Sequence, residues 1–369
     1  GGTLAFTIRI IPIHAQLSQP WDMTYYGEKQ KQHLYTISDE QLRPYFPAQR
    51  ALDGLFEVVK RIYGITASER HDVDVYHPDV RFFDLFDDSG ELRGSFYLDL
   101  YARDNKRGGA WMDDCVGQMR RADGTLQKPV AYLTCNFNRP VSGKPALFTH
   151  NEVTTLFHEF GHGLHHMLTR IETPGVSGIS GVPWDAVELP SQFMENWCWE
   201  PEALAFISGH YETGEPLPKD LLDKMLAAKN YQAALFILRQ LEFGLFDFRL
   251  HAEYDPAKGA RILEILKEIK DQVAVVPGPS WGRFPHAFSH IFAGGYAAGY
   301  YSYLWADVLA ADAYSRFEQE GIFNRETGQS FLDNILTRGG SEEPMELFKR
   351  FRGREPQLDA MLKHYGIKG

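Results

Sequence analysis

The sequence has few cysteines, no long apolar run and no excess of basic residues. Its three cysteines, Cys115, Cys135 and Cys198, stand far apart among 369 residues, and such an odd, sparse set predicts reduced thiols rather than a disulfide framework. No apolar run reaches the roughly 18 residues that a membrane-spanning helix requires. Lysine and arginine total 38 against 49 aspartates and glutamates, which gives a formal net charge of −11 without any basic run. We therefore expect no nucleic-acid partner, no membrane partner and a cytoplasmic location.

The first residues also lack the features of a secretory signal peptide. An apolar stretch covers residues 8–13, but no basic segment precedes it and no small-residue cleavage site follows. The chain shows no internal repeat and no low-complexity segment, and its 44% hydrophobic residues suffice for a sizeable core.

The pattern of apolar residues predicts a mostly α-helical protein with one small β-sheet beside a central helix. Strands are expected at 72–76, 80–84, 94–101 and 129–137, and residues 87–90 carry hairpin-turn chemistry. Helices are expected from Thr149 onward and at 190–199, 221–251, 260–273, 296–318 and 328–336. Thr149 and Glu152 form a capping-box pair just before a run of apolar residues at helical spacing: Val153, Leu156, Phe157, Phe160 and Leu164.

Two histidines on this capped helix predict a zinc site. His158 and His162 are four residues apart, so their rings lie on one face, one turn apart, and can bind one Zn²⁺. Glu159 lies about 100° round the helix and can reach a zinc-bound water without being a ligand, as in metallopeptidases. The alternative is a helix that contains two histidines by chance, but the capped amphipathic context disfavours it.

A catalytic zinc needs a third protein ligand and an open fourth position. We favour Glu188, because Pro190 suits a first helical turn and would place Glu188 at the mouth of a second helix. His165 is a rival ligand, and a Glu stabilised only by the helix dipole is the plainer alternative for Glu188. Glu195, two turns further on, is either a partner for a ligating imidazole or an ordinary surface carboxylate.

The expected chemistry is Glu-assisted attack of zinc-bound water on a scissile carbonyl. Glu159 takes the proton as general base and returns it to the leaving amine. The oxyanion needs a further donor, and residues 288–305 are rich in glycine and tyrosine. Tyr296 and Tyr303, seven apart on an expected helical face, are favoured for function, whereas Tyr300 and Tyr301 are expected to pack in the core. Residues 129–137 are either an edge strand for a peptide substrate or an ordinary buried strand.

Three segments resemble the thimet-oligopeptidase-like zinc metallopeptidases. These are Phe157-His-Glu-Phe-Gly-His162, Glu188-Leu-Pro-Ser-Gln-Phe-Met-Glu-Asn-Trp197 and Gly294-Gly-Tyr…Tyr-Ser-Tyr-Leu-Trp305. The resemblance runs from about residue 20 to residue 369. It implies a zincin-like catalytic region at 19–369 that hydrolyses short peptides as an endopeptidase, in a deep channel between two mostly helical halves.

The resemblance also implies the site residues. His158, His162 and Glu188 match the zinc ligands, with one Zn²⁺ per chain, and Glu159 matches the base. Tyr303 matches the tyrosine that stabilises the oxyanion, and the substrate loop is matched by His290, Gly294, Gly295 and Tyr296. Residues 1–18 are atypical, and family members are much longer. We therefore expect the chain to lack the family's N-terminal half, which becomes a candidate partner.

Three other hypotheses compete with the endopeptidase. One is a catalytically impaired fragment that binds zinc and peptides. The second is a zinc aminopeptidase, because Met194-Glu-Asn196 is similar to an exopeptidase signature, although it follows the zinc helix and lacks the preceding Gly-Ala. The third, a structural zinc site, is disfavoured because such sites usually use cysteines and none lies near His158.

Overall fold

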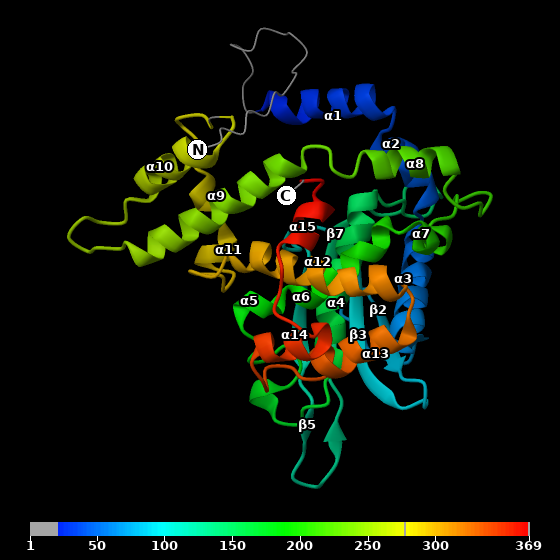
Figure 1. Ribbon diagram of the computed structural model, residues 1–369. Coiled ribbons are helices and arrows are strands. Elements are labelled where there is room, and N and C mark those ends of the chain that lie inside the picture. Colours follow the sequence, from blue (N-terminus) through cyan, green and yellow to red (C-terminus); the bar gives the residue numbers. More distant parts are fainter. Residues whose placement is uncertain (1–20, 277, 368–369) are drawn as a thin grey trace.

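The computed structural model describes residues 21–276 and 278–367. Helices dominate, and one five-stranded sheet lies at one side of the molecule (Figure 1). This confirms the predicted mostly α-helical fold with a small sheet. In the part of the chain that the structure describes, no helix combines the length and the apolar character needed to cross a bilayer. The atypical segment predicted at 1–18 lies outside the described residues.

The sheet is mixed, and its strands follow the order β1-β2-β3-β7-β4. Their bounds are β1 Thr66–Arg70, β2 Arg81–Phe86, β3 Leu92–Tyr101, β4 Trp111–Val116 and β7 Val130–Phe137. β3 and β7 run parallel, whereas the other neighbouring pairs are antiparallel. Asp87 closes the turn between β2 and β3, because its carboxylate accepts hydrogen bonds from the backbone N–H groups of Ser89 and Glu91. The predicted hairpin is thus confirmed. A two-stranded ribbon, β5 (Met119–Arg120) with β6 (Leu126–Gln127), follows β4.

One expected strand is absent. Residues 72–76 form no strand. Instead, the ring of Tyr76 packs near Tyr97 and Tyr132, and its hydroxyl donates a hydrogen bond to Asp99, so one aromatic side chain anchors a loop there. Of the two alternatives for residues 129–137, the ordinary interior strand is confirmed, because β3 and β4 flank β7 on both sides. The edges are β1 and β4, neither of which we expected.

Helices α3 (Ala48–Tyr63) and α4 (His150–Met167) pack against the sheet, and an aromatic contact joins the two helices. The ring of Phe56, on α3, contacts Phe96 of β3 and Phe160 of α4, with centroids 6.4 and 5.9 Å away. These rings belong to the main core, which also takes in apolar side chains of the helices that follow α4. The sheet and this core hold α4 in a fixed place.

The other helices surround this centre. Their bounds are α1 Asp22–Tyr35, α2 Asp39–Leu42, α5 Trp184–Val187, α6 Leu189–Glu195, α7 Pro201–Ile207, α8 Lys219–Ala227, α9 Ala233–Ala252, α10 Ile262–Val273, α11 Ser289–Phe292, α12 Ser302–Glu320, α13 Arg325–Phe331, α14 Pro344–Arg352 and α15 Asp359–His364. The helix predicted at 221–251 is two helices, because the chain leaves α8 and turns at Gln232, whose φ is 57°. The helix predicted from residue 296 begins only at Ser302, so Tyr296 precedes it.

A second, smaller core joins α9, α10 and α11. Its buried members are Phe246, Leu250, Ile265, Leu266, Ile269, Phe288, Ile291 and Tyr300. Figure 1 shows these helices on the side of the molecule away from α3 and the strands. Helix α12 connects the two regions, because it packs against both α6 and α9.

Candidate metal centre

Helix α4 presents two histidines from a well-defined start. The backbone N–H of Glu152 donates to Thr149 Oγ1 (3.1 Å), and the Glu152 carboxylate accepts from the N–H of Thr149 (2.8 Å), which confirms the capping box. The apolar residues predicted to face inward are all buried: Val153, Leu156, Phe157, Phe160 and Leu164. Burial of this face fixes the rotation of the helix, and His158 and His162 then lie together on the side that meets α6.

Helix α6 lies very close to α4 because Gly161 has no side chain. A Cβ atom at Gly161 would sit 2.4 Å from the carbonyl oxygen of Pro190 and 2.6 Å from the Cα of Ser191. Pro190 occupies the first turn of α6, where its missing N–H leaves no hydrogen bond unmade. Glu188 stands at the junction of α5 and α6, so the close approach of the two helices brings its carboxylate to the histidines.

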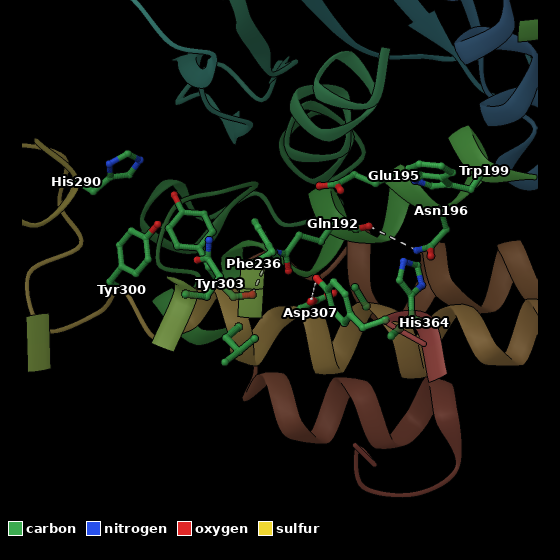
Figure 2. Close-up of a pocket in the computed structure, with 15 residues that line it drawn as sticks. Gln192, Glu195, Asn196, Trp199, Phe236, His290, Tyr300, Tyr303, Asp307 and His364 are labelled. Atoms are coloured by element: carbon green, nitrogen blue, oxygen red, sulfur yellow. Dashed lines mark hydrogen bonds between the residues drawn. The ribbon is translucent and has the colours of Figure 1, made fainter. Parts of the chain in front are cut away.

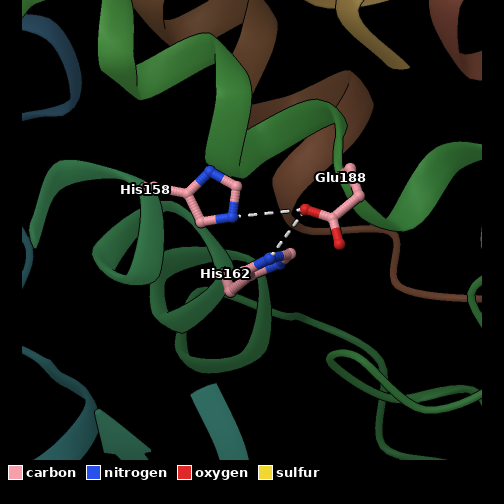
Figure 3. A group of neighbouring side chains, drawn as sticks. All are labelled: His158, His162 and Glu188. Atoms are coloured by element: carbon pink, nitrogen blue, oxygen red, sulfur yellow. Dashed lines mark ion pairs between the residues drawn. The ribbon is translucent and has the colours of Figure 1, made fainter. Parts of the chain in front are cut away.

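Three side chains converge there (Figure 3). Glu188 Oε2 lies 3.0 Å from His162 Nε2 and 3.3 Å from His158 Nε2. Among the described residues, this is the group of His, Cys, Asp or Glu side chains whose ligand atoms lie close enough to hold one ion, all within 4.8 Å. Two histidines and a carboxylate are a donor set of catalytic zinc sites, so the residues fit the expected ion.

The rival ligand His165 is not part of this group. It is buried, and its Nδ1 atom has no hydrogen-bond partner. Burial lowers the pKa of His165 to about 3, so its imidazole stays neutral. Its side chain lies on the buried face of α4.

The hydrogen bonds around Glu188 and His158 orient both groups. Glu188 is 1% exposed, Ser191 Oγ donates to its Oε2 (2.9 Å), and the Tyr296 hydroxyl donates to its Oε1 (2.5 Å). Burial alone would raise the pKa of Glu188, but His162 and His158 hold it well below its usual range. Glu195 Oε1 lies 2.7 Å from His158 Nδ1, the contact expected of a ligand-orienting carboxylate. That bond leaves His158 Nε2 directed at Glu188.

Glu159 lies beside the two histidines and is 5% exposed. Burial raises the pKa of its carboxyl group, and this effect outweighs the opposing one of His158 and His162. A carboxylate with a raised pKa is a better proton acceptor near neutral pH.

A glycine-rich loop between α11 and α12 covers the other side of Glu188. The Tyr296 and Tyr303 rings stack with centroids 5.0 Å apart, and each lies 6.2 Å from the His290 ring. The pair predicted from helical spacing is therefore together, but for a different reason, because Tyr296 lies in the loop and only Tyr303 is on α12. Burial and the nearby Glu188 raise the pKa of both hydroxyls, so they remain hydrogen-bond donors.

Gly294 and Gly295, two of the three glycines in this loop, are there for steric reasons. A Cβ on Gly294 would sit 2.9 Å from the Cα of His290. Gly295 has a φ of +87°, and a Cβ there would sit 3.1 Å from the ring of Trp184. Tyr301 is 42% exposed, so the expectation that it packs in the core is wrong, whereas Tyr300 is buried as expected.

A cavity of about 300 Å³ extends from the tyrosines along α6 and α12. Figure 2 shows His290, Tyr300 and Tyr303 at one end and Trp199, Asn196 and His364 at the other, with Glu195 and Asp307 between them. Burial raises the pKa of Asp307 to about 7, and the Tyr365 hydroxyl donates to this carboxylate (2.5 Å). Polar and apolar side chains both line the cavity, and the three candidate ligands are not among them; Glu195, which contacts His158, connects the cavity to the metal centre.

Sequence reasoning missed three residues that shape the site. Ser191 and Trp184 flank Glu188 in the chain, and only their contacts with Glu188 and Gly295 reveal their roles. Asp247, on α9, is fully buried and holds the glycine loop through backbone hydrogen bonds. An acidic residue between apolar neighbours in a long helix was the available signal for Asp247.

Comparisons with known proteins agree with this geometry. The family profile described as peptidase family M3 matches residues 13–367. Oligopeptidase A of Salmonella typhimurium is 89% identical over 351 residues, which cover 95% of this chain and 52% of that protein. Dipeptidyl carboxypeptidase of Escherichia coli is 39% identical over 355 residues, which cover 95% of this chain and 51% of that protein. The chain thus spans about half the length of these curated relatives.

The fold has a counterpart among solved structures. The M32 carboxypeptidase from Deinococcus radiodurans R1 superposes with a TM-score of 0.52 at 17% identity, covering 88% of this chain and 61% of that one. At this identity the likeness concerns the fold alone.

Proposed function

The chain belongs to peptidase family M3, and from that premise we propose that it carries the catalytic centre of a zinc-dependent endopeptidase for short peptides. The observation that carries the proposal is the convergence of His158, His162 and Glu188, with Glu159 buried beside them. One zinc ion per chain held by these three ligands would polarise the scissile carbonyl and lower the pKa of the attacking water.

The chain's own residues supply the rest of the chemistry. Glu159 accepts a proton from the water and delivers it to the leaving amine. Tyr303 donates its hydroxyl proton in a hydrogen bond to the oxygen on which negative charge develops. Glu195 keeps His158 in one tautomer by occupying Nδ1.

The substrate side of the proposal rests on the glycine loop. His290 lies on α11, Gly294, Gly295 and Tyr296 lie in the loop that follows it, and Tyr296 is the member that contacts a candidate ligand directly. We propose that these residues hold the peptide backbone beside Glu159. A cytoplasmic site of action remains part of the proposal and is supported by the three cysteines, which are all unpaired.

The test is cleavage of an internally quenched short peptide that is blocked at both ends, together with elemental analysis. We expect cleavage, about one zinc per chain, and loss of both after chelation with recovery on adding zinc. An aminopeptidase needs a free amino terminus, and an enzyme like the relative named dipeptidyl carboxypeptidase needs a free carboxyl terminus. Cleavage only of peptides with a free end would therefore exclude the endopeptidase.

A second candidate function is an impaired fragment that binds zinc and peptides. An exposed apolar surface on α9 favours it. Large apolar side chains of α9 are exposed: Phe236, Leu241, Leu245 and Phe248. About half of the relatives' length lies outside the match, and we propose that this other half covers the surface.

This candidate predicts slow turnover and self-association by the chain alone. Adding the relatives' N-terminal half in trans should raise turnover and reduce association, as seen in parallel assays and size-exclusion chromatography. Turnover equal to that of a full-length relative, from a monomer of this chain, would eliminate the impaired fragment.

A further inference from the structure

Helix α9 carries a buried carboxylate aimed at the glycine loop. Asp247 is 0% exposed and stands next to Phe246 of the small core. Its Oδ1 accepts a hydrogen bond from the backbone N–H of Ala298 (2.9 Å), and its Oδ2 accepts one from the N–H of Tyr300 (2.8 Å). His251 Nδ1 hydrogen-bonds the main-chain carbonyl oxygen of Asp247 (2.8 Å) and lies 3.0 Å from the same Oδ1, so it contacts Asp247 from one turn further along α9. Each carboxylate oxygen therefore holds one backbone N–H of the loop.

The loop needs such a restraint because its backbone is strained. Ala298 has a φ of 55°, in the left-handed region that residues with a Cβ atom rarely adopt. Only surrounding contacts keep a residue in such a conformation. The bond from the Ala298 N–H to a buried, charged acceptor is a contact of this kind, because water cannot compete for it.

The restrained residues stand between the two tyrosines of the site. Tyr296 comes two residues before Ala298, and Tyr303 lies in the first turn of α12, three residues after Tyr300. The Tyr300 ring packs against Tyr303, with centroids 4.9 Å apart, and against Phe288 of the small core (5.1 Å). Holding the backbone at 298 and 300 therefore fixes the direction of both tyrosine hydroxyls.

We propose that Asp247 is a positioning residue for Tyr296 and Tyr303, acting through the loop backbone without touching the substrate. This inference rests on the proposed function, because the tyrosines must act in catalysis for their position to matter. A shift of about 1 Å in a catalytic group can cost on the order of 10²-fold in rate. A carboxylate is needed because its two oxygens can accept from two N–H groups. An amide has one acceptor oxygen and would place its own N–H donor against the second N–H.

The decisive variant is Asp247→Asn, with Glu242→Gln as the matched control. Glu242 is another buried carboxylate of α9, but it pairs with Arg239 (2.5 Å). For Asp247→Asn we expect a fall in kcat of about 10²-fold, unchanged zinc stoichiometry, and much faster amide hydrogen exchange at Ala298 and Tyr300. Glu242→Gln should leave kcat and the exchange of these two amides as they are.

Two further measurements separate positioning from a general structural role. In a Tyr303→Phe background, Asp247→Asn should cost little more, because residues that act as a unit are not additive. Ala298→Gly should restore part of the kcat of Asp247→Asn, because glycine adopts a positive φ without strain. The proposal would be overturned if the losses in kcat from Asp247→Asn and Tyr303→Phe multiplied in the double variant. It would also be overturned if Ala298→Gly restored none of the kcat lost in Asp247→Asn.

Hydrogen exchange tests the two hydrogen bonds from the loop to Asp247 even if the Asp247→Asn variant does not fold. We expect slow exchange of the Ala298 and Tyr300 amides in the unmodified chain, and fast exchange there would refute the proposed restraint by Asp247. If these amides exchange slowly but Glu159→Gln retains full kcat, the proposed function fails and the restraint by Asp247 does not. The failure of the inference and the failure of the proposed function are therefore distinguishable.

Discussion

The candidate metal ligands lie at the faces and ends of regular helices, whereas Tyr296 and the backbone that leads to Tyr303 belong to a loop. On the ligand side, α4 and α6 are in backbone contact at Gly161 and are packed into the main core. On the tyrosine side, the loop rests on the smaller core of α9 to α11 and is restrained by hydrogen bonds to Asp247.

Hydrogen bonds join the two sides: the Tyr296 hydroxyl donates to Glu188 Oε1, and Gln192 Nε2 of α6 donates to the main-chain carbonyl oxygen of Tyr303. A metal ion needs ligands at fixed distances before any substrate arrives, and packed helices supply that. Groups that recognise a substrate or an oxyanion can sit on a loop, provided that something holds it. The metal ligands thus lie on packed helices and the tyrosines on a loop held by hydrogen bonds. Three substitutions test this division and a fourth tests the neighbouring cavity, from the largest expected effect to the smallest.

The largest effect is expected on the tyrosine side. Tyr303→Phe removes only the hydroxyl, so kcat should fall by about 10²–10³-fold with little change in KM, because the bond forms to charge that develops in the transition state. Steady-state kinetics on the quenched peptide measures this. An unchanged kcat would reduce Tyr303 to a packing residue, and an effect on KM alone would make it a binder of the ground state.

On the ligand side, Glu188→Ala should weaken zinc binding by about 10²-fold or more, because loss of even a ligand's supporting partner costs 10–100-fold. His165→Ala is the matched control and should leave the affinity nearly intact, since His165 lies outside the converging group. Competition with a chromogenic chelator gives both affinities. The reverse order would identify His165 as the third ligand.

The contact between α4 and α6 can be tested without touching a ligand. In Gly161→Ala the new Cβ meets the Pro190 carbonyl at 2.4 Å, so we expect a loss of about 1–3 kcal/mol in unfolding free energy together with weaker zinc binding. Gly163→Ala, on the same helix, places its Cβ 3.1 Å from a Leu133 methyl group that can move, and should cost far less. Equal stabilities from urea unfolding would mean that the helices do not depend on Gly161.

The smallest effect is expected at Asp307, which belongs to neither side. The folded pKa of about 7 lies above that of the unfolded chain, so the folded state binds more protons between roughly pH 4 and 7 and stability falls as pH rises through this window. Asp307→Asn removes this loss. Relative to the parent, the variant should gain on the order of 1 kcal/mol between pH 5 and pH 8 in urea unfolding. If the difference in unfolding free energy between the variant and the parent did not grow with pH, the raised pKa of Asp307 would be contradicted.

The ligand side was predictable because its signals are local. A capping box, two histidines one turn apart and a proline in a first helical turn each act within a few residues, and together they located His158, His162 and Glu188. The tyrosine side was predicted only in part. Tyr296 and Tyr303 do meet, but through a loop whose course depends on Asp247, about 50 residues earlier in the chain.

The errors in the sheet have the same origin. Whether a strand is interior or at an edge depends on partners that are distant in sequence, so the sequence left both alternatives open for residues 129–137, and it did not predict β4, which covers one side of β7. At 72–76, a single ring packed on the sheet replaces the expected strand.

The central claim is that Glu159 transfers the proton at a metal centre built by His158, His162 and Glu188. Glu159→Gln keeps the shape of the side chain and leaves all three ligands in place, so zinc content should stay at about one per chain while kcat falls by about 10²–10⁴-fold. Zinc content and turnover of the blocked peptide should be measured on the same preparations of parent and variant. Retained zinc with nearly lost turnover is the predicted result, and equal kcat in the two proteins would contradict the assignment of Glu159 as the base.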